Sequence, residues 1–170
     1  TWSCWYRKTA TGAMHFMGTW GSSSSERQFV PYQFGQGGSS AMYVYMGSSI
    51  GSNRLMFQNT SNVLFNVNTW YHMAFVYNES ESSNADKLKF YLDGTPITNQ
   101  TAGFALTSLN TVTNSFDIGG PVTPFLTGNL DEVAVFNRAL NTTEIAALYD
   151  GTGSNIRPSN LMATDLNPIA

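Results

Sequence analysis

The acidic residues are the first candidates for chemistry in this sequence. Hydrolysis of a glycosidic bond needs two carboxyl groups that face the same sugar. Asp131 and Glu132 are adjacent in a predicted strand, where neighbouring side chains point to opposite faces, so we do not expect them to act as a pair. Glu79 and Glu81 lie in a polar stretch without flanking apolar residues. The acids therefore predict that this chain is not an enzyme.

Cysteine and histidine offer little reactive chemistry. Cys4 is the single cysteine, so the sequence holds neither an internal disulfide nor a cysteine metal cluster. Its position in an alternating aromatic strand predicts a buried, unreactive thiol. Trp70 and His72 alternate onto one strand face, and neither His72 nor His15 has a second ligand at metal-binding spacing. We interpret His72 as a packing residue.

A group of tyrosines indicates a different function, the binding of sugars. Tyr43 and Tyr45 share one face of a predicted strand, and the apolar residues between them share the other. Tyr32, from the preceding strand, extends the tyrosine face. Flat aromatic rings beside polar groups bind sugar rings by stacking and hydrogen bonding. The alternative is that both faces of this strand are buried, by a second sheet and by loops or a partner.

The elements that must position these residues are mostly strands. Short apolar segments alternate with Gly, Ser and Asn-rich breaks, which is typical of an all-β sandwich. We predict strands near residues 2–8, 14–19, 28–34, 41–47, 54–58, 63–67, 70–77, 87–93, 115–118 and 128–137.

A single short helix is predicted over 142–149. Asn141 and Glu144 have the spacing of a capping box, and Gly151 follows the last helical residue. Ile145, Leu148 and Tyr149 form one apolar stripe on it.

Composition limits the classes of protein to consider. A chain of 170 residues suits one domain, which we place at residues 1–151, followed by a linker or extended arm over 152–170. A net charge of −3 and a charged fraction of 11% differ from the basic surface of a nucleic-acid-binding protein. An aromatic fraction of 14% argues against disorder, and no apolar run is long enough to span a membrane.

Several motifs, in this order along the chain, resemble the laminin-G-like, or concanavalin A-like, jelly-roll domains. The motifs are TWSCWYRK (1–8), WYHMAFVYN (70–78), KLKFYLDGTPI (87–97), and FDIGG followed by FLTGNLDEVAVFNRALNTTEI within 116–145. The resemblance implies a two-sheet antiparallel β-sandwich of this jelly-roll type, with one sheet concave.

The resemblance also implies a role for Asp131 and for the strand that contains it. Members of the family often hold a structural calcium ion near this strand, so Asp131 becomes a candidate Ca²⁺ ligand. The alternative is that Asp131 caps the turn after Gly128. Family members normally begin with a strand that pairs with the closing strand, so we expect 128–137 to present an open edge that a neighbour or another segment fills. Glu132 is expected to make a structural contact with Arg138 or a loop amide.

The end of the sequence resembles structural proteins of bacterial viruses, in RALNTTEIAALYDGTG (138–153) and the Pro and Asn-rich stretch after it. This implies a non-catalytic virion component, such as a head-decoration, tail or fibre module, at a virion or extracellular surface. Its partners would be other copies or other structural subunits of the particle. The alternative is a lectin-like module that binds cell-surface glycans through Tyr32, Tyr43 and Tyr45. A glycoside hydrolase is a more distant alternative.

Overall fold

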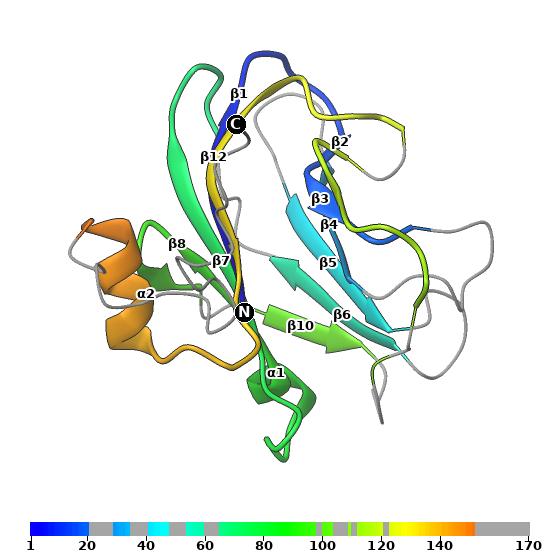
Figure 1. Ribbon diagram of the computed structural model, residues 1–170, viewed down its shortest axis with the longest axis vertical. Helices are drawn as coiled ribbons and strands as arrows, with labels where there is room; N and C mark the ends of the chain where they lie inside the picture. Colours follow the sequence, from blue (N-terminus) through cyan, green and yellow to red (C-terminus); the bar gives the residue numbers. More distant parts are fainter. Residues whose placement is uncertain are drawn as a thin grey trace, which may run out of the picture.

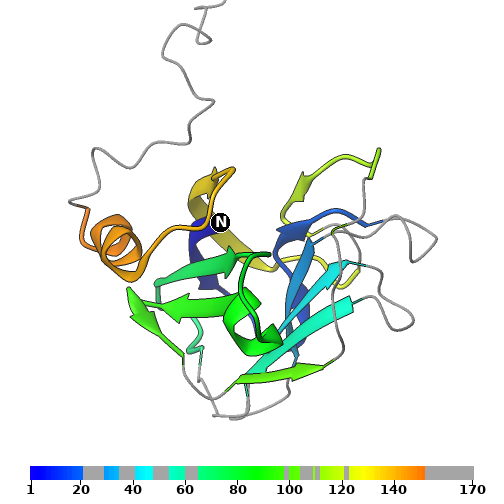
Figure 2. The ribbon, with the colours of Figure 1, turned by 90° about the horizontal axis from the view of Figure 1, so that it is seen from below.

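The computed structural model describes residues 1–20, 29–34, 41–47, 54–59, 65–97, 100–103, 109, 112–120 and 123–151, with only the backbone for 32–34, 41, 54–59 and 100–103. In this part of the chain, two five-stranded antiparallel sheets pack face to face (Figure 1, Figure 2). This architecture confirms the predicted antiparallel β-sandwich.

The first sheet has the strand order β12-β1-β7-β8-β9. Its strands are β1 (Trp2–Lys8), β7 (Tyr71–Tyr77), β8 (Leu88–Leu92), β9 (Thr95–Pro96) and β12 (Gly128–Val135). Strands from opposite ends of the sequence meet here, because β12 pairs with β1 (Figure 1). Asp93 and Gly94 turn the chain from β8 into β9, and both have positive φ, of 48° and 74°, as a tight Asp-Gly hairpin requires.

The second sheet has the strand order β10-β6-β5-β4-β2. Its strands are β2 (Met14–His15), β4 (Phe29–Phe34), β5 (Ala41–Gly47), β6 (Arg54–Asn59) and β10 (Gln100–Gly103). A separate two-stranded ladder joins β3 (Met17–Gly18) to β11 (Asp117–Ile118). Gly18 is required in this ladder because a Cβ there would lie 2.1 Å from the carbonyl oxygen of Phe29.

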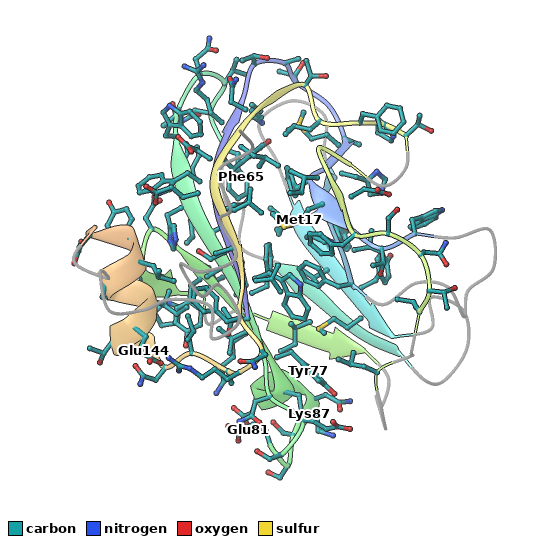
Figure 3. All side chains as sticks on the ribbon, viewed as in Figure 1. Met17, Phe65, Tyr77, Glu81, Lys87 and Glu144 are labelled. Atoms are coloured by element: carbon teal, nitrogen blue, oxygen red, sulfur yellow. The ribbon has the colours of Figure 1, made fainter. Side chains whose placement is uncertain are left out.

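The core lies between the two sheets and is built by alternation along the strands. Cys4 and Tyr6 of β1 are fully buried in it, while Trp5 between them belongs to the outer face. Figure 3 shows Met17 and Phe65 in the space between the sheets, where both join the same core cluster. Each such side chain contributes about 1.5–3 kcal/mol by leaving water.

The helix α2 (Thr142–Tyr149) covers part of the outer face of the first sheet. Its Ile145 and Leu148 pack against Ala74 and Val76 of β7 and against Tyr91 of β8. This second, smaller apolar cluster explains why β7 is buried on both faces. The predicted helix and its apolar stripe are confirmed with the predicted bounds.

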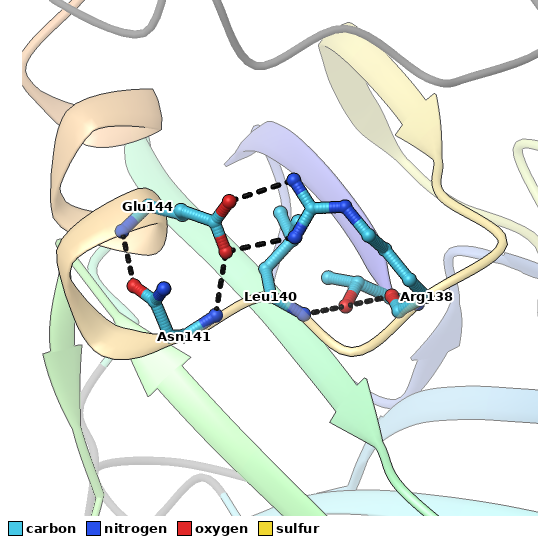
Figure 4. A network of polar contacts seen from close by, with 5 residues as sticks. Arg138, Leu140, Asn141 and Glu144 are labelled. Atoms are coloured by element: carbon cyan, nitrogen blue, oxygen red, sulfur yellow. Dashed lines mark hydrogen bonds and ion pairs between the residues drawn. The ribbon is translucent and has the colours of Figure 1, made fainter.

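A network of polar contacts holds the start of α2 (Figure 4). Asn141 accepts a hydrogen bond from the Glu144 N–H, and the Asn141 N–H donates to the Glu144 carboxylate, each at 2.9 Å. Arg138 binds the same carboxylate through two nitrogens, at 2.6 and 2.9 Å. This ion pair lowers the pKa of Glu144. Arg138 therefore pairs with Glu144 and not with Glu132, and the alternative contact of Glu132 with a loop amide stays a prediction.

Several strand and helix predictions need correction at their edges. Residues 65–67, predicted to belong to a strand, do not form one. The rest of that predicted strand, 63–64, lies outside the described residues. The four-residue helix α1 (Asn84–Lys87), capped by the Ser83 hydroxyl, was not predicted and lies between the predicted strands 70–77 and 87–93, with Lys87 at the start of the second. The strands β9 and β10 were not predicted either. None of the described helices is long and apolar enough to cross a membrane.

The register of β12 also differs from simple alternation. Trp5 is opposite Asp131 and Ser3 is opposite Ala134, so β12 has one residue more than β1 between these pairs. Glu132 lies in this bulge with a φ of 48°. As a result Leu130 and Val133 both pack toward the core, and Asp131 and Glu132 are both exposed. The prediction that these two acids point to opposite faces is wrong.

Candidate functional site

The predicted tyrosine platform lies on the outer face of the second sheet. Tyr43 and Tyr45 are half-buried and alternate in β5 with Met42, Val44 and Met46, which are fully buried in the core. The strand register places Tyr32 of β4 directly opposite Tyr43. Tyr32 and Tyr43 therefore belong to one cross-strand row, which Gln58 of β6 continues on the other side of Tyr43.

The tyrosine face is not uniformly open. Tyr45 is opposite Val30, which is only 1% exposed although it faces away from the core cluster. The outer face of the second sheet is therefore covered at Val30. At this end of the tyrosine face, the alternative that both strand faces are buried applies. On β5, Tyr43 and Tyr45 themselves are half-buried.

A second candidate site lies on the outer face of the first sheet. A shallow hollow of about 310 Å³ is lined by Trp5, Trp70, Asp131 and Glu132. Trp5 points outward from β1, and its ring lies 5.4 Å from the ring of His72 and 5.6 Å from the ring of Tyr149 in α2. Trp70 precedes β7 and is 38% exposed. Helix α2 ends at Tyr149, beside Trp5. The hollow therefore lies next to the part of the sheet that α2 covers.

Arg7 lies next to this hollow, on the ring of Trp70. The Arg7 guanidinium lies 5.1 Å from the centre of the Trp70 ring, within the range of a cation–π contact. Its Nε and Nη2 donate to Asn129 Oδ1 at 3.3 and 2.8 Å. Asp131 Oδ1 accepts a hydrogen bond of 2.8 Å from the Glu132 N–H, which helps to stabilise the bulge.

The sequence pattern does not indicate Trp5 or Trp70 as site residues. Both belong to motifs that predict strands, and Trp70 shares its predicted face with His72. The available signal was the alternation of Trp5 with Cys4 and Tyr6, which turns Trp5 away from the core. What could not be read from the sequence is the bulge at Glu132, which brings both acids to the same hollow.

His72 and Ser3 form a buried polar pair next to this hollow. The Ser3 hydroxyl and His72 Nε2 are 2.9 Å apart, and His72 is 1% exposed. Burial lowers the pKa of His72 to about 4, so the imidazole is neutral near pH 7. Since the ring contacts those of Trp5 and Tyr149 and lies out of reach of solvent, the structure agrees with our interpretation of His72 as a packing residue.

Two other carboxylates line a hollow of about 300 Å³ near the start of α2. Glu81 accepts a hydrogen bond from Asn78 and lies 4.0 Å from Lys89 Nζ, and Asp86 accepts one from the Ser83 hydroxyl. Tyr91, which also lines this hollow, is buried and presents little of its ring. These contacts give both acids structural roles in the loop and in α1.

The calcium ligand role of Asp131 stays a prediction, because calcium also binds backbone and amide carbonyl oxygens. Among the described residues, no group of three or more His, Cys, Asp or Glu side chains could hold a metal ion. Calcium takes six to eight oxygen ligands, and Asp131 has one oxygen engaged by Glu132 N–H. The prediction stays open to a direct test. A melting temperature that rises with calcium in the wild type but not in Asp131→Asn supports it, and an unchanged wild-type value contradicts it.

Comparison with known proteins agrees with the fold. A family model described as the concanavalin A-like lectin/glucanases superfamily, laminin G type, matches residues 1–146. A heptameric SAP-like pentraxin from Limulus polyphemus has a similar structure, with a TM-score of 0.59 and 12% sequence identity, over 92% of this chain and 71% of the pentraxin chain. The comparison with curated proteins found no match.

Proposed function

Because the chain belongs to the concanavalin A-like lectin/glucanase superfamily, we propose that it is a non-catalytic binding domain that recognises a saccharide through its tyrosine face. The observation that supports this most directly is the strand register, which places Tyr32 and Tyr43 side by side on adjacent strands. Tyr45 lies two residues along β5 on the same face. Half-buried tyrosines hold their rings in place at low entropic cost and still present an edge or face to a sugar.

A glycan array tests this proposal. Wild-type protein is expected to bind a defined set of glycans, and the double variant Tyr43→Ala with Tyr45→Ala is expected to lose at least about ten-fold in affinity, since stacking on an aromatic ring is removed. Tyr43→Phe keeps the ring and is expected to retain most of the binding. Trp70→Ala is a matched control, because it removes an exposed aromatic ring from the opposite sheet.

Two results would contradict the saccharide proposal. One is the absence of any bound glycan in the wild type. The other is a double variant that keeps its melting temperature and binds like the wild type. If the double variant does not fold, Tyr43→Ala alone provides the comparison.

The absence of catalysis is part of the same proposal. The exposed acids Asp131 and Glu132 lie on the first sheet, away from the tyrosine face, and Glu81 and Asp86 are engaged by neighbouring side chains. We expect no release of reducing sugar from any glycan that the domain binds. Release that Glu81→Gln or Glu132→Gln abolishes would overturn this part of the proposal.

A second candidate function, which can hold together with the first, is a structural role on a virus particle. It is supported by the resemblance of residues 138–153 to virion proteins and by the position of β12 at the edge of the first sheet. Val135 on this strand is 46% exposed, and an open edge strand favours pairing with a neighbouring subunit. Mass spectrometry of purified particles tests it, and the absence of peptides from this chain would contradict it.

A further inference from the structure

The hollow between Trp5 and Trp70 has walls of two kinds. Two indole rings from the first sheet form one part, and the carboxylates of Asp131 and Glu132, brought together by the bulge in β12, form the other. The hollow lies on the opposite sheet from the tyrosine face, so a ligand here would be independent of the saccharide proposed above.

The structure already contains a cation on one of these rings. The Arg7 guanidinium lies 5.1 Å from the centre of the Trp70 ring, and its nitrogens donate to Asn129 rather than to a carboxylate. Arg7 does not line the hollow. The Trp70 ring is thus placed where its π-system attracts positive charge, and it stays 38% exposed despite this contact.

The described residues provide no cation that neutralises the carboxylates of the hollow. Within the described part of the chain, neither Asp131 nor Glu132 takes part in an ion pair, and both are exposed. Among the described residues, the Asp131 carboxylate accepts one hydrogen bond, from the Glu132 N–H, and the Glu132 carboxylate accepts none. The described residues that line the hollow therefore supply carboxylates and indole rings but no cation.

We propose that this hollow binds an arginine side chain of a partner protein. A guanidinium is planar, stacks on an indole ring, and presents paired N–H donors that match a carboxylate. Both walls of the hollow favour this group, through a cation–π contact with Trp5 or Trp70 and charge-assisted hydrogen bonds to Asp131 or Glu132. A neutral saccharide offers these walls no positive charge, so it would gain neither the cation–π contact nor the pairing of opposite charges.

The experiment compares two peptides that differ only in charge. The probes are N-acetyl-Gly-Arg-Gly-amide and the same peptide with citrulline, which keeps the size and shape of arginine but is neutral. Binding is followed by NMR on the indole N–H signals of the four tryptophans, assigned with Trp→Phe variants. We expect millimolar binding of the arginine peptide that moves the Trp5 and Trp70 signals but not that of Trp20, and at least ten-fold weaker binding of the citrulline peptide.

A variant that keeps the shape of the hollow tests whether the two negative charges contribute to binding. Asp131→Asn with Glu132→Gln removes both charges, and the asparagine oxygen can still accept the hydrogen bond from the backbone at residue 132. We expect this variant to weaken binding of the arginine peptide at least five-fold and to remove most of its salt dependence. Tyr43→Ala with Tyr45→Ala, on the other sheet, should bind the peptide like the wild type.

Three outcomes would overturn the inference. They are equal binding of the arginine and citrulline peptides, unchanged binding by the Asn/Gln variant, and no movement of the Trp5 and Trp70 signals at 50 mM peptide, about fifty-fold above a millimolar dissociation constant. If simple methyl glycosides move these two signals and the arginine peptide does not, the hollow is a saccharide site instead. Failure of the glycan array would leave the arginine inference untouched, because the two sites lie on opposite sheets.

Discussion

Trp5 and Asp131 lie directly opposite each other across β1 and β12, and the register between the two strands shifts immediately beyond this pair. The extra residue of β12 is accommodated at Glu132, whose φ of 48° is unfavourable for a residue with a side chain. The bulge turns Asp131 and Glu132 to the same side as Trp5. This local backbone feature creates the aromatic and acidic hollow.

The first prediction concerns the strain at this bulge. Replacing Glu132 by valine is expected to cost about 1–2 kcal/mol, because a β-branched residue at positive φ clashes with its own backbone. Glu132→Gly should not destabilise the fold, since glycine adopts this conformation freely. Urea unfolding of both variants measures the difference. Equal stability of the two variants would contradict the bulge geometry.

The second prediction concerns the pH dependence of stability through His72. Its pKa is about 4 in the folded chain and about 6.5 when unfolded. Between these values the unfolded chain binds a proton that the folded chain does not, so the free energy of unfolding falls as the pH falls from about 6.5 toward 4. The expected slope from this residue is about 1 kcal/mol per pH unit.

Urea unfolding between pH 7 and pH 4.5 checks the effect of His72. The variant His72→Gln retains a hydrogen-bonding side chain near Ser3 but cannot titrate, so its stability should change less over this range. Parallel curves for the two proteins would show that His72 does not remain neutral in the folded state.

The third prediction concerns the reactivity of Cys4. The thiol is fully buried, and burial raises its pKa to about 12. Since the thiolate is the reactive form, Cys4 should not react with a disulfide reagent at pH 8 in the folded protein. In denaturant the reagent should report one thiol per chain, because the sequence has one cysteine. Rapid reaction without denaturant would place Cys4 outside the core.

The fourth prediction concerns the start of α2. Asn141→Ala removes the side-chain acceptor for the Glu144 N–H and is expected to cost about 1 kcal/mol. Asn141→Ser or Asn141→Asp should retain most of the stability, because both side chains cap helices well. Thermal unfolding compares them, with the exposed Thr143→Ala as a control. Equal losses in Asn141→Ala and Asn141→Ser would exclude capping as the cause.

Local patterns in the sequence were sufficient for most of the fold. Period-2 alternation predicted the bounds of β1 and β5, because one face of each enters the core while the other does not. The capping box and the apolar stripe predicted the bounds of α2. Both patterns can be recognised in the sequence, since they involve residues three or four apart.

The candidate sites depended on register, which a single sequence does not contain. Tyr43 and Tyr45 could be assigned to one face from their spacing alone, because both belong to one strand. The position of Tyr32 opposite Tyr43 required the pairing of β4 with β5. Likewise, Trp5 and Asp131 are 126 positions apart and meet only because β1 pairs with β12. The bulge at Glu132 has no signature in the sequence, since it arises from the fit between two strands, and only the tertiary structure could place both acids beside two tryptophans.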